Sequence, residues 1–518
     1  METQNVVPKR AGLVLTTLVL GALVANLNLS VANIALPDIA RAFDAAQTQV
    51  NLIAVGCTLG LAMSVLYLGA IGDRYGRKLL LLLGMALTVP ASLLSAYSTD
   101  PTLLIGARVF TGLAAGMAYP TTLALITALW GPGKARVKAI ALWSSVGGGG
   151  AIIGPVIAGA MLEQWWWGSV FLIALPPAII VFFLVWFFVP AHVQESTEKI
   201  DHPSGVLSVI MVALLVLGLG SISAPGFFVP SLIAIAVSLL LVLLFGWRQL
   251  KVKFPLYDLA LAKRVTFWVP SIAGAIVFGS MMGAMFIGQQ FLQNVLQYST
   301  LEAGVAILPA AVGMMGVAQI SAKLLNTRGG RFTMLAGFIS VLIGFLIMLT
   351  AWTLNNSYLP VGLAYLFVGA GAGLALTPAS RSLTNSVPVP KVGMASATTD
   401  LQRDLGGSIM QALLGSLLTA GYAHAFMSSI SSSPSSEQVS AATQTMLTKS
   451  FAGAQSVAAS NPQYADNILT AARESFLTGS NWAYFMACAF VVIGAVIVAT
   501  RYPNKQHENE LFAQYAGE

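Results

Sequence analysis

Three ionisable side chains, Asp400, Arg403 and Asp404, fall inside one long apolar stretch of this 518-residue chain. A charged group at the centre of a bilayer costs at least about 3 kcal/mol on insertion scales, so such groups indicate a function or a firm partner. On an ideal helix the three share one face, within an arc of about 100°. Arg403 can neutralise one carboxylate, which leaves the other to carry a proton. A structural ion pair, or a cluster wetted at the helix end, is the alternative interpretation.

A fourth ionisable candidate within an apolar stretch is Arg108, which has no acidic partner nearby in the sequence. Its positive charge could shift proton affinity across a central cavity and so join the proton-coupling group. The alternative is a structural clamp onto backbone carbonyls or onto Asn28. The four histidines lie outside the deep parts of the apolar stretches: His192, His202, His424 and His507. That distribution argues against a membrane enzyme with a histidine-based catalytic cluster.

The ten residues 69–78 read Gly-Ala-Ile-Gly-Asp-Arg-Tyr-Gly-Arg-Lys and separate two apolar stretches. Glycine allows a tight reversal and a close helix approach. The carboxylate can cap or pair at a helix end, while the cations hold the segment on the cytoplasmic side. A simple charged turn is the alternative. The residues expected to form this conformational loop are Gly69, Gly72, Asp73, Arg74, Gly76, Arg77 and Lys78.

The apolar stretch 267–292 carries a stripe of residues suited to a pocket for bulky apolar ligands, since methionine adapts its shape to what it contacts. Helix packing and lipid contact are the alternative use of the same stripe. The residues predicted to line a substrate cavity are Asn28, Asn33, Phe278, Met281, Met282, Met285, Gln289 and Gln290.

The composition indicates a polytopic membrane protein. Charged residues make up 9% of the chain, against about 25% in soluble domains, and the mean hydropathy is +0.80. The net charge of +7 is spread over short loops and does not indicate a nucleic-acid partner. Cys57 and Cys488 lie far apart and predict neither a disulfide nor a metal site. The segment Gly131–Ala135 lacks the pattern of an ATP-binding loop, which argues against an ATP-driven pump.

A membrane span needs about 20 mostly apolar residues, and fourteen stretches of that kind can be counted. We expect spans near residues 12–36, 48–71, 79–98, 102–127, 137–161, 168–189, 204–224, 227–247, 267–292, 301–322, 333–353, 358–378, 393–421 and 481–500. With both termini in the cytoplasm, every Lys and Arg of the loops falls inside except Arg41, Lys449 and Arg473, as the positive-inside rule requires.

Two parts of the chain repeat each other. Phe110-x-Gly112-x-x-x-Gly116 in the fourth span returns as Phe367-x-Gly369-x-x-x-Gly373 in the twelfth. This repeat predicts two six-helix bundles with two additional central helices, a transporter design. We expect an N-terminal bundle at 1–190, two linker spans at 191–265 and a C-terminal bundle at 266–518. The bundle at 266–518 includes an external loop, 422–480, with amphipathic helices near 437–456 and 464–476.

The loop at 69–78 resembles, nearly letter for letter, the loop between helices two and three of major facilitator superfamily transporters. The segment from Gly150 through Gly154-Pro155 to Gly159 resembles the fifth-helix motif of antiporters in that superfamily, where it is expected to pack tightly and restrict leak. Arg108 with the glycines that follow it resembles the fourth-helix motif of drug:proton antiporters. The fourteen spans point to the fourteen-spanner drug:proton antiporter family, which implies an all-α major facilitator fold.

One position departs from that family. Its first helix usually carries an embedded aspartate, and Asn28 stands in that place here, so the role of that aspartate cannot be transferred. The resemblance implies proton-coupled export of small amphipathic drugs from a bacterial inner membrane by a monomer, with no cofactor and no metal. The alternative is export of a lipid or metabolite, without proton coupling because of Asn28.

Overall fold

The computed structural model describes residues 8, 10–130, 134–191, 200–354, 357–387, 392–433 and 439–516, and these residues are arranged almost entirely as helices. His192, Lys199 and Lys391 lie outside the described residues. The helices of the first half of the chain are α1 (Ala11–Phe43), α2 (Gln47–Tyr75), α3 (Arg77–Ala96), α4 (Pro101–Leu129), α5 (Lys134–Leu162), the 3-10 turn η1 (Trp167–Leu172), α6 (Leu175–Phe188), α7 (His202–Ser221) and α8 (Phe228–Gln249).

The second half of the chain follows a short helix, α9 (Leu259–Ala262). Its helices are α10 (Val265–Asn294), α11 (Thr300–Ala306), α12 (Leu308–Gly316), α13 (Ala318–Arg328), α14 (Gly330–Ala351), α15 (Tyr358–Asn385), α16 (Val392–Ser432), α17 (Ala441–Lys449), α18 (Phe451–Ser460), α19 (Ala465–Arg501) and α20 (Lys505–Ala516). The predicted span at 301–322 is therefore broken into three short helices. Pro309 has no amide hydrogen, and the first break falls at Ile307 just before it.

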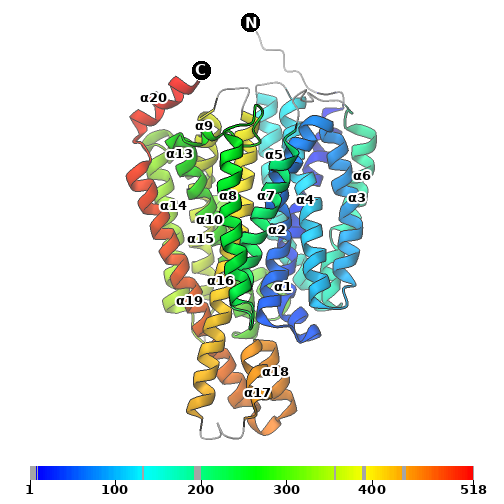
Figure 1. Cartoon of the computed structure of the whole chain (residues 1–518), viewed down its shortest axis with the longest axis vertical. Coiled ribbons are helices and arrows are strands. Elements are labelled where there is room, and N and C mark those ends of the chain that lie inside the picture. The colour runs from blue at the N-terminus through cyan, green and yellow to red at the C-terminus, as the bar shows by residue number, and fades with distance from the viewer. Residues whose placement is uncertain are drawn as a thin grey trace.

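The long helices run side by side along the long axis of the molecule (Figure 1). Both chain ends lie at one end, here called the terminal face, and α17 and α18 lie at the opposite, distal end. Twelve helical segments of the described residues are long and apolar enough to cross a membrane. Two further long helices, α5 and α16, of 29 and 41 residues, run beside these twelve segments but are not counted among them. The fold is all-α as expected, and the count of fourteen spans stays a prediction.

The repeat seen in the sequence has a counterpart in the packing. Helix α2 packs on α4 as α12 packs on α15, α3 on α4 as α14 on α15, and α1 on α5 as α10 on α16. A Cβ added at Gly112 would lie 2.1 Å from the Cys57 carbonyl oxygen of α2. At the matching residue Gly369 it would lie 1.8 Å from the Ala310 carbonyl oxygen of α12. The repeated glycines thus allow the same close helix crossing twice.

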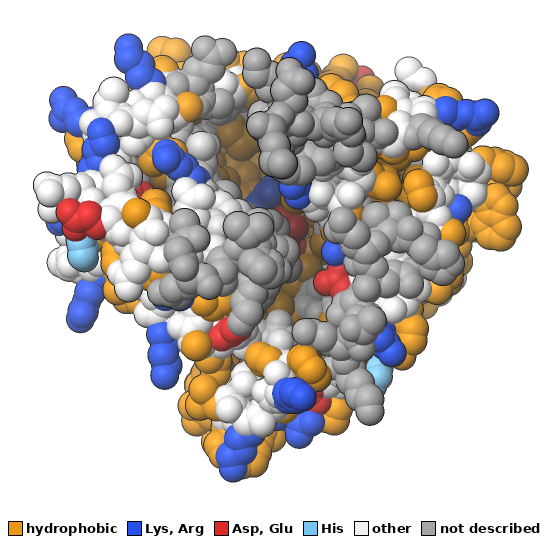
Figure 2. Space-filling view, turned by 90° about the horizontal axis from the view of Figure 1, so that it is seen from above, with side chains coloured by type: hydrophobic (Ala, Val, Ile, Leu, Met, Phe, Trp, Pro, Cys, Tyr) orange, Lys and Arg blue, Asp and Glu red, His pale blue; other side chains and the backbone are white. Residues whose placement is uncertain are grey.

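The two sets of helices meet along α2 with α16 and along α5 with α11. Near the distal end, side chains bond across this boundary. Gln47 Nε2 donates to Gln290 Oε1 at 2.9 Å, and Asn51 Nδ2 donates to Thr419 Oγ1 at 2.9 Å. The terminal face, in contrast, is hollowed at its centre between Lys, Arg, Asp and Glu side chains (Figure 2). The structure is therefore closed distally and open toward the terminal face.

The two helices α7 and α8 attach beside this boundary. α7 packs on α2 and α16, whereas α8 is covered mainly by α7. Arg248 of α8 pairs with Asp201 at the start of α7, with Nη2 2.6 Å from Oδ1. Burial alone would raise the pKa of the Asp201 carboxyl, but hydrogen bonds from Arg248 and Ser204 bring this pKa below its ordinary value. The domain boundaries at 190 and 265 stay a prediction.

The distal segment 422–480, expected to be a loop, is largely helical in its described part. α16 continues to Ser432, and α19 begins at Ala465, so the helix expected near 464–476 is the first part of a spanning helix. Apolar packing explains these extensions, because Phe451 of α18 stacks edge-on against Phe476 of α19 with ring centroids 6.2 Å apart. Lys449 also pairs with Asp44 after α1, at 2.8 Å.

The helix α20 fastens the terminal-face ends of several helices. The buried Glu508 accepts a hydrogen bond from the Gly330 amide at the start of α14, at 2.9 Å, and another from the Tyr502 hydroxyl, at 2.9 Å. The Tyr502 oxygen also lies 2.8 Å from Ser382 Oγ of α15. Burial and the Glu508 carboxylate raise the pKa of the Tyr502 phenol, which keeps it protonated as a donor at neutral pH.

We expect Glu508→Ala to lower the thermal unfolding midpoint of the purified protein. The change leaves the Gly330 amide buried without its acceptor, at a cost of about 1–3 kcal/mol, and removes one of the two hydrogen-bond partners of the Tyr502 hydroxyl. The matched control is Glu510→Ala in the same helix, where the carboxylate is exposed and contacts the exposed side chains of Gln506 and His507. Equal midpoints for the two variants would contradict the role of Glu508.

Candidate functional site

A cavity of about 730 Å³, including the open solvent at its mouth, lies between the two sets of helices. Its walls come from α1, α5, α10, α12, α15 and α16. The lining residues are Asn26, Leu29, Ser30, Asn33, Pro155, Phe278, Met281, Met282, Met285, Gln289, Ile307, Met314, Leu376 and Arg403.

Helical spacing places two stripes of these residues opposite each other. On α10 the five lining residues from Phe278 to Gln289 follow the steps i, i+3, i+4, i+7 and i+11, which keep one face of a helix. On α1 the lining residues Asn26, Leu29, Ser30 and Asn33 follow the same rule. Asn26 and Ser30 were not predicted to line the cavity. Their spacing could have indicated it, because Asn26, Ser30 and Asn33 are polar residues at i, i+4 and i+7 and so share one face of α1.

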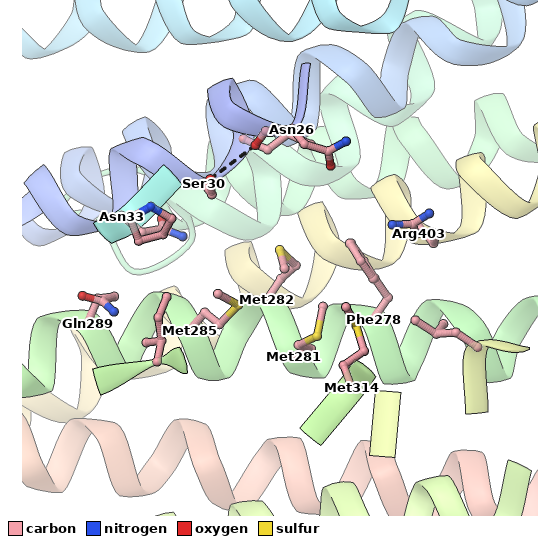
Figure 3. Close-up of a pocket in the computed structure, with 14 residues that line it drawn as sticks. Asn26, Ser30, Asn33, Phe278, Met281, Met282, Met285, Gln289, Met314 and Arg403 are labelled. Carbon is pink, nitrogen blue, oxygen red and sulfur yellow. Dashed lines mark hydrogen bonds between the residues drawn. The ribbon is translucent and has the colours of Figure 1, made fainter. Parts of the chain in front are cut away.

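The α10 wall of the cavity is apolar between polar ends, whereas α1 contributes the polar residues Asn26, Ser30 and Asn33 (Figure 3). Asn26 and Arg403 lie toward one end, Asn33 and Gln289 toward the other, and Phe278 with the methionines lies between. Gln289 Nε2 donates to the Ala303 carbonyl oxygen at 2.9 Å, which fixes the orientation of its amide. The Oε1 atom of Gln289 and the Oδ1 atom of Asn33 are buried without a hydrogen-bond partner among the described residues. These oxygens are unsatisfied acceptors on residues that line the cavity.

Two residues predicted for the cavity lie elsewhere. Asn28 is buried but does not line the cavity, because two residues along α1 turn it about 200° away from Asn26. Gln290 lies one residue past Gln289, about 100° around α10, and there accepts the hydrogen bond from Gln47. The remaining predicted lining residues face the cavity, and their role in binding stays a prediction.

The three charged residues of α16 are arranged differently from our expectation. We predicted that Arg403 contacts Asp400 or Asp404, but no ion pair within 4.0 Å joins them in the described part of the chain. The Arg403 guanidinium instead lies over the Phe278 ring, 4.8 Å from its centroid, and beside Tyr119 of α4. Both carboxylates are buried, and Asp404 Oδ2 has no hydrogen-bond partner among the described residues.

Arg108 stands apart from that cluster. Its side chain is fully buried, and Nη2 donates to the backbone oxygen of Asn28 at 2.9 Å. Its guanidinium also lies over the Phe171 ring, 5.3 Å from the centroid. These contacts match the clamp interpretation and tie α4 to the middle of α1. Within the described residues Arg108 forms no ion pair with Asp400 or Asp404, so a shared role with them stays a prediction.

The segment 69–78 is mostly helical rather than a loop. α2 runs to Tyr75, and Gly76, with φ of 110°, is the junction to α3. Asp73 Oδ1 lies 2.9 Å from Arg77 Nη2, and Arg77 Nη1 donates to the Ala124 oxygen of α4 at 3.2 Å. Further along, Lys78 Nζ donates to the Trp186 oxygen of α6 at 2.9 Å. Other members of the set are spread around these contacts: Gly72 packs on Leu80, Gly69 faces open space and Arg74 is exposed.

We expect Asp73→Asn to impair transport while the protein stays in the membrane. The amide keeps the shape but loses the charge that orients Arg77, and Arg77 reaches α4. The Asp73 side chain is half exposed, so solvent screens the pair and it contributes only about 0–1 kcal/mol to stability. The measurement is substrate efflux at matched membrane levels, with Asp100→Asn, at the distal end of α4, as a control. Efflux equal to wild type would contradict a conformational role for Asp73.

The helix α5 packs closely at the residues of the antiporter-like motif that can be described. A Cβ at Gly154 would lie 2.4 Å from Ser30 Oγ of α1, and one at Gly159 would lie 2.5 Å from the Thr300 oxygen. Pro155 lines the cavity. The surroundings of Gly150 lie outside the described residues. Close packing at Gly154 and Gly159 was expected, and its role in restricting leak stays a prediction.

Long apolar helices around a central cavity that is closed at one end are the architecture of a multi-pass membrane transporter. The chain belongs to the Major Facilitator Superfamily, which it matches over residues 18–411.

Curated relatives and solved structures extend over most of the chain. It is 31% identical over 497 residues to the multidrug efflux pump LfrA of Mycolicibacterium smegmatis, covering 96% of this chain and 97% of that protein. It is 29% identical over 402 residues to the multidrug resistance protein Stp of Mycobacterium tuberculosis, covering 77% and 74%. A bacterial homologue of the human lysosomal transporter Spinster, in an inward-facing and unoccupied conformation, shares the fold with a TM-score of 0.64 at 17% identity, covering 97% and 98%.

Proposed function

We propose that this protein is a secondary active transporter that exports small amphipathic compounds across a bacterial inner membrane in exchange for protons. The cavity carries the proposal, because residues from both sets of helices line it and combine an apolar stripe on α10 with polar side chains. Its methionines suit ligands of varied shape. The names of the relatives LfrA and Stp support drugs as the compounds exported.

The same proposal includes the arrangement in the membrane. The segments 1–190 and 266–518 act as two halves that move about the cavity, with 191–265 attached between them. The protein works as a monomer with both termini in the cytoplasm, as the distribution of Lys and Arg supports. The terminal face is then cytoplasmic, and the present state is open to the inside. Such a state receives a compound that is to be exported.

A neighbouring pair of methionines offers a sharp test of the cavity. Met314 lines it, whereas Met315 is 63% exposed on the outer side of α12. Met314→Trp should fill the cavity and abolish export of a fluorescent amphiphile from cells, while Met315→Trp should leave export unchanged. Export by Met314→Trp at the wild-type rate and matched membrane level would contradict the proposed site.

Asn28 favours a second candidate, export of a lipid or metabolite without proton coupling. A membrane-embedded carboxylate is absent at that position, and the backbone of Asn28 serves as the acceptor for Arg108. Proton uptake by proteoliposomes during export distinguishes the two candidates, because only the first moves protons.

A further inference from the structure

The charge of the cavity is set by one side chain. Of the described residues that line it, Arg403 alone carries a formal charge. Its Nε atom is buried without a hydrogen-bond partner among the described residues, and the flat face of its guanidinium lies over Phe278. An arginine held in a membrane-embedded cavity keeps strong hydrogen-bond donors for an anionic or electron-rich group.

The two neighbouring carboxylates do not share this position. Around an ideal helix Asp400 lies about 60° and Asp404 about 100° to the same side of Arg403. They are 6% and 8% exposed, and neither lines the cavity. A ligand in the cavity therefore meets the cation first, while the carboxylates lie behind it within the protein. Coulombic interaction weakens with distance, so the nearer charge has the greater effect on the ligand.

The other end of the cavity complements a different group. There the Gln289 Oε1 and Asn33 Oδ1 atoms are buried acceptors without partners in the described structure. Leaving a buried acceptor unsatisfied costs about 1–3 kcal/mol, which a ligand that donates a hydrogen bond would recover. Between the ends lie the Phe278 ring and the methionine side chains (Figure 3).

We propose that the preferred substrates are anionic amphiphiles: compounds with an apolar, ring-containing body, a carboxylate or similar anion directed at Arg403, and a hydrogen-bond donor directed at Gln289 and Asn33. Lipophilic cations are poorer substrates, because they would place a positive charge against Arg403. This inference rests on the proposed function, since it names the substrate class of the same cavity.

Three matched fluorescent probes test the inference with the purified full chain. Dansylglycine carries a carboxylate, its methyl ester is neutral, and dansyl-ethylenediamine carries an ammonium group. We expect the acid to bind about tenfold more tightly than the amine, the size of one charge-assisted contact. Arg403→Gln should weaken binding of the acid about tenfold and binding of the ester less than about twofold. Arg381→Gln, an exposed arginine outside the cavity, should change neither.

Other results would overturn the inference. Tighter binding of the amine than of the acid would overturn it. The clearest case would be a preference for the amine that Asp404→Asn removes, because the carboxylates rather than Arg403 would then determine which charge the cavity prefers. If Arg403→Gln weakened binding of the acid and of the ester equally, Arg403 would have only a structural role in the cavity. If that variant does not fold, Arg403→Lys tests the same point, since a retained cation must retain the preference for the acid.

The neutral ester separates this inference from the proposed function. Ester binding that Met314→Trp abolishes supports the cavity whatever the charge preference. If the ester binds there and the acid binds no better than the amine, the charge inference fails and the proposed function stands. Failure of all three probes to bind contradicts the proposed function itself.

Discussion

The Gly112→Ala protein is expected to reach the membrane in much smaller amounts than wild type and to unfold at a lower temperature. The new Cβ would lie 2.1 Å from the Cys57 carbonyl oxygen and 2.9 Å from the Gly60 Cα. Both are backbone atoms of α2, so no side chain can turn aside, and the whole helix pair must separate. Such overpacking typically costs about 1–3 kcal/mol. Yield and thermal unfolding in detergent measure the effect.

The control for this change lies in the same helix. At Gly106 an added Cβ would meet no neighbouring atom within 4 Å, so Gly106→Ala makes the same chemical change without a clash and should behave as wild type. Gly369→Ala should lower the membrane level and the unfolding temperature in the same way, because the added Cβ would meet the Ala310 carbonyl oxygen of α12 in the second half of the chain. A Gly112→Ala protein as stable as Gly106→Ala would refute the close crossing.

Asp404→Asn is expected to abolish proton-coupled export while sparing substrate binding. Asp404 is buried in α16, one turn further from the terminal face than Asp400. Asparagine has nearly the same size but cannot exchange a proton, so transport should lose its response to a pH gradient. Binding should persist, because the carboxylate does not line the cavity.

The measurement is proton movement induced by substrate in proteoliposomes, for wild type and Asp404→Asn together. Asp38→Asn is the matched control, since Asp38 lies near the distal end of α1, outside the cavity, and pairs with Arg41. Equal proton movement in wild type and Asp404→Asn would place coupling elsewhere in the chain. No proton movement in either would favour the uncoupled alternative based on Asn28.

Periodic features of the sequence predicted much of this architecture. Long apolar stretches mark helices directly, and the repeated Phe-x-Gly-x-x-x-Gly pattern matched two equivalent crossings. The stripe from Phe278 to Gln289 predicted one cavity wall because residues at i, i+3, i+4 and i+7 must share a face. These features depend only on the residues within one helix, so they can be predicted without knowing what that helix packs against.

Features that depend on a second element could not be predicted in this way. Arg403 turned away from the carboxylates of its own helix because Phe278, more than a hundred residues earlier, lies within reach. The segment 422–480 became helical because Phe451 and Phe476 pack together. The apolar spacing of the stretch 301–322 hid the break at Ile307, just before Pro309. The first two outcomes were decided by contacts between residues distant in sequence.

The cap that Glu508 places on α14 also has a consequence for the order of events during synthesis. The two residues joined by this hydrogen bond are 178 positions apart. At about 5–20 residues per second, a ribosome makes Glu508 roughly 10–35 s after Gly330. During that interval the first turn of α14 has only water for its amide, at the membrane surface. The first turn of α14 therefore lacks this cap until α20 has been made and docks, and for that period this end of the nascent helix stays accessible to chaperones and proteases.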